Sequence, residues 1–286
     1  MTKPSVTYSK IKKVSNSAIV EADDILASEE PLEIRIGYGP LANRQQKNIS
    51  VTMRTPGNDF ELALGFLFTE GIIKRSEDIS IIRYCTEANT LKNQENIVRA
   101  ELNENVEFDF KNLERNFYTT SSCGVCGKAS IDAVRTVCEI KNEGDNLKVS
   151  RELIYTLPAL LRKHQNVFEY TGGLHACALF DMDGNLSLTR EDVGRHNALD
   201  KLIGACLAIK TDNPDGFPFH NYILLLSGRA SFELIQKAAI AGIKMVAAIG
   251  APSSLAVEMA KEFGITLIGF LRGETFNVYF GEERVS

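Results

Sequence analysis

The sequence lacks an apolar run long enough to cross a membrane, and it lacks an excess of positive charge. Its 37 acidic and 32 basic side chains leave a net charge of -5, so we expect no general attraction to nucleic acid or to an anionic membrane. The lysines near the N-terminus are followed by no apolar segment, which argues against a signal peptide. Any site for a phosphate group must therefore be local.

The two common glycine-rich phosphate-binding motifs are also missing. No G-x-G-x-x-G follows a predicted strand, and G-x-x-x-x-G-K-[ST] occurs nowhere in the chain. Their absence argues against an ATPase and against an ordinary nicotinamide-dependent dehydrogenase.

The cysteines are too few and too irregularly spaced for the disulfide framework of a secreted domain, so we expect a reducing, cytoplasmic location. Four of them lie in apolar patterns that are typical of core positions, and two form a close pair. The four are Cys85, Cys138, Cys177 and Cys206, and the pair is Cys123 and Cys126.

What the chain has is the ordinary balance of a folded protein, with 44% hydrophobic and 24% charged residues among 286, enough for one or two domains. Residues 1–30 show no clear periodicity and are interpreted as an arm. Alternating segments then predict strands, and Asn58 is a candidate N-cap of a helix that ends at Gly71. The predicted strands of this small α+β unit are 32–36, 49–54, 79–84 and 97–102.

The last third predicts an α/β sheet, because buried-type strands alternate with helices in a βαβαβ order that implies parallel strands and right-handed crossovers. Before it, a polar segment at 190–197 opens a helix. The strands are 222–226, 245–249, 265–271 and a closing 275–280, with helices at 231–241 and 253–263. They are preceded by a helix at 158–164, a strand at 173–180 and a hairpin return at 185–189.

The pair Cys123 and Cys126 lies in a polar loop with two glycines, residues 118–128, which holds little that can anchor a core. A helix is predicted at 129–139, so the loop precedes a helix N-terminus. The helix dipole and the nearby Lys128 favour a thiolate and lower the pKa of either cysteine. Such cysteines are kept for reactivity rather than for packing.

Three chemical interpretations of this pair stay open. A zinc site needs two further ligands, which Cys138, His175 or Cys177 would have to supply because no second C-x-x-C exists. A thioredoxin-like dithiol should follow a strand of a βαβ unit, whereas this pair follows a polar loop. A sulfur carrier would hold sulfur on one cysteine as a persulfide and deliver it to an acceptor.

Three strand ends in the last third are candidates for a phosphorylated ligand, because ligands of open α/β sheets bind where strands lead into helix N-termini. Each carries Gly, Ser or Arg, whose amides, hydroxyls and guanidinium groups can hold phosphate. Gly and Ser at such turns are equally typical of simple helix caps. The segments are residues 227–231, 250–254 and 270–274.

Other polar residues have competing interpretations. His175 and Cys177 are spaced like the H-x-E element of zinc deaminases, but Cys177 stands where the catalytic glutamate would be, and the later P-C-x-x-C is missing. His175 is therefore as well explained as a hydrogen-bonded strand residue. Glu191, Asp192 and His196 suit either a cation site or a helix-capping cluster.

With these residues in view, the chain resembles the FdhD/NarQ family of sulfurtransferases that formate dehydrogenase requires. No other family known to us joins the matching segments in this order. They are Met53-Arg54-Thr55-Pro56-Gly57, Leu64-Gly65-Phe66-Leu67 with Glu70-Gly71, Ser122-Cys123-Gly124-Val125-Cys126-Gly127, Thr171-Gly172-Gly173-Leu174-His175, residues 190–200, Ser227-Gly228-Arg229, residues 251–256 and Gly269-Phe270-Leu271-Arg272-Gly273.

The resemblance implies a cytoplasmic homodimer that accepts sulfur from a cysteine desulfurase as a persulfide. The sulfur passes to the molybdenum of bis-molybdopterin guanine dinucleotide, the bound substrate, before that cofactor enters the formate dehydrogenase catalytic subunit. By motif position, Cys123 carries the persulfide and Cys126 is its loop partner. The expected cofactor-binding residues are Phe270, Leu271, Arg272, Gly273, Glu274 and Thr275, with Ser227, Gly228, Arg229 and Ser253 from the neighbouring strand ends.

The resemblance also implies a cytidine-deaminase-like α/β/α fold for the C-terminal domain, within a chain that is α+β overall. The expected organisation is an arm at 1–30, a small α+β domain at 31–117, a mobile C-x-x-C loop at 118–128 and the cofactor-binding domain at 129–286. We expect no tightly held metal. The alternative function is a zinc-stabilised, non-catalytic protein that binds an apo-oxidoreductase.

Overall fold

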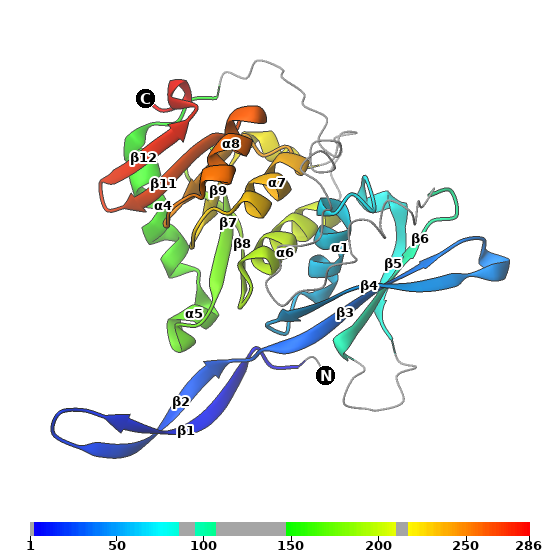
Figure 1. The fold of residues 1–286 in the computed structure, drawn as a ribbon, viewed down its shortest axis with the longest axis horizontal. Helices are drawn as coiled ribbons and strands as arrows, with labels where there is room; N and C mark the ends of the chain where they lie inside the picture. The colour runs from blue at the N-terminus through cyan, green and yellow to red at the C-terminus, as the bar shows by residue number, and fades with distance from the viewer. Residues whose placement is uncertain (1–2, 86–94, 107–146, 210–216) are drawn as a thin grey trace.

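Two β-sheets and a projecting hairpin organise the chain (Figure 1). The computed structural model describes residues 3–85, 95–106, 147–209 and 217–286. The predicted boundary after residue 117, the C-x-x-C loop at 118–128 and the helix at 129–139 lie outside these ranges. No helix in the described ranges has the length and apolar character needed to span a bilayer.

The larger sheet has six strands in the order β12-β11-β10-β9-β7-β8. Its centre is parallel, because β10 pairs in parallel with both β9 and β11, while β12, β7 and β8 pair antiparallel with their neighbours. The strands are β7 (His175–Asp181), β8 (Leu186–Asp192), β9 (Tyr222–Leu226), β10 (Met245–Ala248), β11 (Thr266–Arg272) and β12 (Thr275–Phe280). The predicted βαβαβ order is confirmed.

Helices cover both faces of this sheet and give three layers. Buried side chains of α6, α7 and α8 pack on one face, and those of α4 pack on the other. Because both faces are covered, the central strands are continuously apolar rather than alternating. The helices are α4 (Arg151–Lys163), α5 (Asn166–Thr171), α6 (Arg195–Ala208), α7 (Phe232–Ile240) and α8 (Ser254–Glu262).

The smaller sheet has four strands in the order β4-β3-β6-β5, and α1 packs on it over a separate core. This is the predicted α+β unit, and its helix ends as expected before Gly71. Asn58 is the N-cap, but its side chain makes no capping hydrogen bond and its backbone is left-handed at φ 58°. The elements are β3 (Glu30–Tyr38), β4 (Gln45–Arg54), α1 (Asp59–Thr69), β5 (Ile79–Tyr84) and β6 (Ile97–Leu102).

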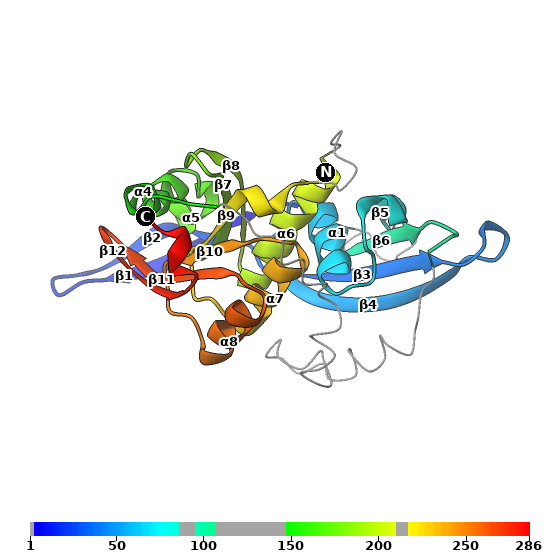
Figure 2. The same cartoon turned by 90° about the horizontal axis from the view of Figure 1, so that it is seen from above.

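The two units meet where α1 crosses α6, and both views show these helices side by side (Figures 1 and 2). A Cβ added to Gly65 would lie 1.9 Å from the carbonyl oxygen of Asp200, and one added to Gly204 would lie 1.9 Å from that of Glu61. The backbones are therefore in direct contact, which only glycine at both positions permits.

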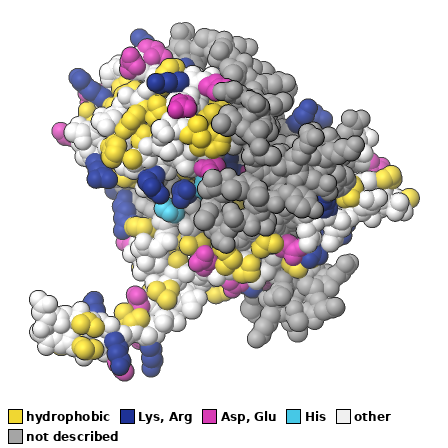
Figure 3. Space-filling model, in the orientation of Figure 1, with side chains coloured by type: hydrophobic (Ala, Val, Ile, Leu, Met, Phe, Trp, Pro, Cys, Tyr) yellow, Lys and Arg dark blue, Asp and Glu magenta, His cyan; other side chains and the backbone are white. Residues whose placement is uncertain are grey.

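The N-terminal arm is a β-hairpin, a regular structure that the sequence pattern did not predict. β1 (Val6–Val14) pairs with β2 (Ile19–Ala27) in register over nine positions, and the hairpin projects from the body. Its side chains are a mixture of apolar and charged groups (Figure 3). Because neither face is covered by a core, the apolar alternation that reveals a strand is weak, and cross-strand pairs such as Lys10 with Asp23 support it instead.

A second correction concerns the segment predicted to open a helix at residue 190. Residues 190–192 are the end of β8, and α6 begins only at Arg195. The strand continues through charged residues, because the side chains of Arg190 and Asp192 have partners of opposite charge in Glu61 and Lys201.

Candidate functional site

The three predicted strand ends lie side by side, because β9, β10 and β11 are adjacent and parallel. Backbone hydrogen bonds join these three segments to one another. The N–H of Gly250 donates to the carbonyl of Gly228 at 2.9 Å, and the N–H of Phe270 donates to the carbonyl of Gly250 at 3.0 Å. We call residues 227–231, 250–254 and 270–275 the strand-end surface.

Gly250 is at the centre of this surface and has no room for a side chain. A Cβ there would lie 2.9 Å from the backbone nitrogen of Arg229 and from the carbonyl carbon of Gly228. The first two segments are therefore packed backbone to backbone, which leaves their side chains to point elsewhere.

The side chains of the strand-end surface differ in what they can offer a ligand. Arg229, Arg272 and Glu274 are exposed, whereas Leu271 is fully buried in the core beneath. Ser253 is also exposed, and its hydroxyl accepts the N–H of Ala256 at 3.2 Å as the N-cap of α8. The interpretation of Ser253 as a helix cap is thus confirmed. Its hydroxyl can still donate one hydrogen bond and accept another from a ligand.

Ser227 joins strands. Its backbone N–H donates to the carbonyl of Ala176 at 3.0 Å, and its hydroxyl accepts the N–H of Ala176 at 2.8 Å. The residue therefore extends the pairing of β9 with β7.

Phe270 has the most unusual conformation of the surface. Its φ is 54°, a region that bulky side chains adopt at a cost, and it lies in a register shift between β11 and β12. Phe270 is 40% exposed although its neighbour Leu271 is 0% exposed. The irregularity turns the ring outward, and such local strain is concentrated at ligand-binding sites.

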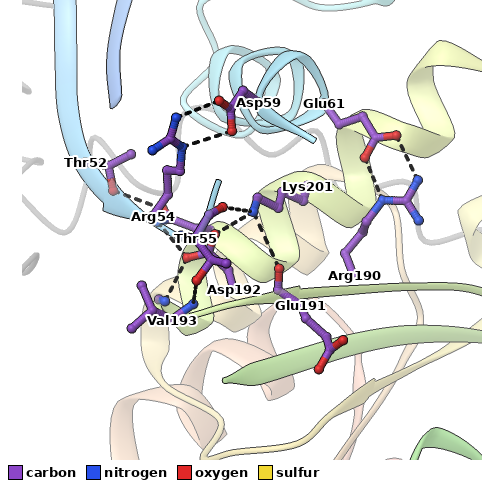
Figure 4. A network of polar contacts seen from close by, with 12 residues as sticks. Thr52, Arg54, Thr55, Asp59, Glu61, Arg190, Glu191, Asp192, Val193 and Lys201 are labelled. Carbon is purple, nitrogen blue, oxygen red and sulfur yellow. Dashed lines mark hydrogen bonds and ion pairs between the residues drawn. The ribbon is translucent and has the colours of Figure 1, made fainter. Parts of the chain in front are cut away.

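Beside these segments, a buried network ties the smaller unit to the end of β8 (Figure 4). The carboxylate of Asp192 lies 2.6 Å from Nζ of Lys201 and accepts the N–H of Thr55 at 3.1 Å. Lys201 also donates to the carbonyl of Thr55 at 2.8 Å. Sequence reasoning missed Lys201, since a lysine in a helix gives no sign of burial until its distant partner is known.

The cluster of Glu191, Asp192 and His196 does not converge on one point. Glu191 accepts the N–H groups of Val167 and Phe168, so it caps α5. His196 lies 3.7 Å from Glu233, and its interaction with that carboxylate lowers the pKa of Glu233 to about 2. Among the described residues, no three His, Cys, Asp or Glu side chains form a metal-binding group.

The described cysteines include two of the predicted core residues. Cys177 and Cys206 are buried, and burial raises the pKa of both thiols, that of Cys206 to about 12. Cys177 packs among the side chains beneath α6 and is therefore a poor source of the thiolate that zinc would need. Cys123, Cys126 and Cys138 lie outside the described residues.

A separate pocket of about 270 Å³ lies between the two units. It is lined by the loop that leads into α1, by the junction of α4 and α5, and by β8. No residue of the strand-end surface lines it.

The chain belongs to the FdhD/NarQ family, because the sequence model of that family matches residues 27–286. The resemblance noted in the sequence is therefore confirmed. It is 50% identical over 279 residues to a protein of Streptomyces coelicolor named Sulfur carrier protein FdhD, covering 97% of this chain and 94% of that one. A Mycobacterium tuberculosis protein of the same name is 44% identical over 286 residues, covering 99% of both chains.

A solved structure has a similar fold. It comes from Desulfotalea psychrophila and is named as a formate dehydrogenase accessory protein. The TM-score is 0.72 over 99% of this chain and 100% of the other, at 23% identity. At that identity the similarity establishes the fold alone, and it agrees with the mixed α and β architecture described above.

Proposed function

We propose that this protein is a cytoplasmic sulfurtransferase that serves formate dehydrogenase. It takes sulfur from a cysteine desulfurase as a persulfide on Cys123 and passes it to the molybdenum of bis-molybdopterin guanine dinucleotide. Membership of the FdhD/NarQ family and the name Sulfur carrier protein FdhD of relatives that match nearly the whole chain support this proposal.

The observation that carries the cofactor-binding half is the convergence of three strand ends with exposed cationic and aromatic groups. Arg229 follows β9 and Arg272 ends β11, with the segment after β10 between them, and both guanidinium-bearing residues are exposed. Phe270, two residues before Arg272, is also exposed. Guanidinium groups suit the oxygens of a diphosphate, and an exposed ring suits a purine face. These groups fit a guanine dinucleotide.

The sulfur-carrying half rests on the chemistry of the C-x-x-C pair. A thiolate of Cys123 attacks the terminal sulfur of the desulfurase persulfide, and the desulfurase cysteine leaves as its thiolate. Cys126 is the loop partner in this proposal. The homodimer expected for the family belongs to the proposal as well.

Intact mass after incubation with a cysteine desulfurase and L-cysteine tests the carrier role. We expect the wild-type chain to gain one sulfur atom that a thiol reductant removes. The Cys123→Ala variant should gain none, because the attacking thiolate is gone, yet it should bind GDP with unchanged affinity in calorimetry. Cys85→Ala is the matched control and should take up sulfur normally, since Cys85 is a half-buried residue of the smaller unit.

Two results would contradict the proposal. Uptake of sulfur by Cys123→Ala at the wild-type level would remove Cys123 as the carrier. Stoichiometric zinc with no sulfur uptake by the wild-type chain would favour the alternative of a zinc-stabilised binding protein.

A further inference from the structure

The turn between β8 and α6 lies at the same edge of the sheet as the strand-end surface, and the proposed function has not used it. β7 pairs antiparallel with β9, and β8 pairs antiparallel with β7, so β8 ends at the edge where β9 ends. α6 begins at this edge with Arg195.

Buried hydrogen bonds set the position of this turn (Figure 4). One carboxylate oxygen of Asp192 accepts the N–H of Gly194 at 2.8 Å and Nδ2 of Asn197 at 3.1 Å, while the other pairs with Lys201. The N-cap is Gly194, so no side chain there satisfies the first-turn amides of α6. The hydrogen bonds of Asp192 therefore fix the turn that leads into α6, and α6 begins at this edge of the sheet without a capping side chain.

Arg195 has a buried donor without an acceptor. Its Nε is shielded from solvent, and no described residue accepts a hydrogen bond from it. The acidic side chains nearby on β8 and α7 have other partners, since Asp192 pairs with Lys201 and Glu233 lies 3.7 Å from His196. A buried donor of this kind costs free energy unless a ligand supplies the acceptor.

His175 connects Arg195 to the strand-end surface. The ring packs against Gly228, with Nδ1 3.2 Å from the position that a Cβ on Gly228 would take. Burial lowers the pKa of His175, and the positive charge of Arg195 lowers it further while the carboxylate of Asp192 opposes it. The ring is therefore neutral at pH 7 and can donate one hydrogen bond to an anion beside Gly228.

We propose that Arg195, the first-turn amides of α6 and His175 form a phosphate subsite beside Gly228, which holds a diphosphate group of the nucleotide. A guanidinium fork, backbone amides and one neutral imidazole are donors that suit a phosphoryl oxyanion. The subsite lies on the β7 side of the surface, whereas Arg229 follows β9 and Arg272 ends β11. The inference rests on the proposed nucleotide binding, and its test separates the two.

Calorimetry with GDP measures the contribution of Arg195 to affinity. Arg195→Gln removes the charge and should weaken GDP binding by about tenfold or more, as expected for the loss of a charge-assisted hydrogen bond. Arg195→Lys keeps the charge but loses the planar fork, so its affinity should fall between the two. Arg151→Gln is the matched control, because Arg151 is an exposed residue of α4 whose ion pair is with its neighbour Glu152.

The Nε–H resonance of Arg195 gives a second readout that does not depend on the nucleotide. Titration with inorganic pyrophosphate should shift this resonance saturably in the folded wild-type chain, and the Arg195→Lys spectrum assigns it. If pyrophosphate shifts the resonance while GDP does not bind, the subsite stands and the nucleotide part of the proposed function fails. If neither probe moves the resonance, or if Arg195→Gln binds GDP as tightly as wild type, the subsite is overturned.

Discussion

Phe270 shows how one residue can carry both strain and exposure. Its left-handed backbone at φ 54° costs about 1–3 kcal/mol for a residue with a side chain, and its ring is 40% exposed. Neither property stabilises the fold, which makes Phe270 a residue whose backbone and side chain are worth testing for a role in ligand binding. The backbone and the ring can be tested separately.

Replacing Phe270 by Gly and by Ala removes the ring in both cases and relieves the strain only in the first. We expect Phe270→Gly to be more stable than Phe270→Ala by about 1 kcal/mol in urea unfolding, because glycine adopts positive φ freely. Both variants should bind GDP more weakly than wild type. Equal stability of the two would show that the backbone is not strained, and unchanged affinity would remove the ring from the site.

At the scale of elements, the crossing of α1 and α6 holds the two sheets together. Gly65 and Gly204 let the helix backbones touch, a contact that no larger side chain permits. In an isolated helix, alanine is more favourable than glycine by about 1 kcal/mol. Replacing a glycine at the crossing by alanine should therefore stabilise the protein if helix preference dominates and destabilise it if tight packing dominates.

Gly204→Ala should destabilise the protein by about 2 kcal/mol or more, because its Cβ would lie 1.9 Å from the carbonyl oxygen of Glu61. Thermal and urea unfolding measure the change. The control is Gly173→Ala, where the nearest atom to a Cβ is 3.7 Å away and the effect should be small. A gain in stability for Gly204→Ala would mean that the helices separate at little cost.

At the scale of the whole molecule, a buried ion pair joins the end of α1 to α6 and α7. Nζ of Lys237 lies 2.9 Å from the Asp200 carboxylate and donates to the hydroxyl of Thr69 at 2.8 Å. Burial alone would lower the pKa of Lys237, but the charges of Asp200 and Glu70 outweigh it and raise that pKa. The ammonium therefore stays charged, and the two units share one electrostatic network.

Asp200→Asn should destabilise the protein by about 3 kcal/mol, because it leaves the buried Lys237 charge without its main partner. The double variant Asp200→Asn with Lys237→Met should recover part of that loss, since neither charge then remains buried. Urea unfolding of the wild type, of Asp200→Asn, of Lys237→Met and of the double variant completes the double-mutant cycle. Additive effects of the two substitutions would show that the pair contributes no coupling between the units.

Regular segments of the chain were predictable to the residue or nearly so. The strands 79–84, 97–102, 222–226 and 275–280 have the predicted bounds, because apolar patterns there are bracketed by turn residues. The N-terminal hairpin was missed, since neither of its faces builds a core and its pattern carries no clear period. The end of β8 was misread as a helix because its charged residues have partners far away in sequence.

For the site, the sequence by itself determined the three strand-end segments that are candidates for a ligand and the parallel order of their strands, because both follow from local apolar pattern and βαβ order. It also determined the family, through motifs spread along the chain. Only the tertiary structure decided that β7 and β8 bring His175 and Arg195 to the same edge, that Leu271 is buried, and that Phe270 is turned outward. Those facts depend on strand order, register and long-range ion pairs, which arise from contacts between residues far apart in the chain.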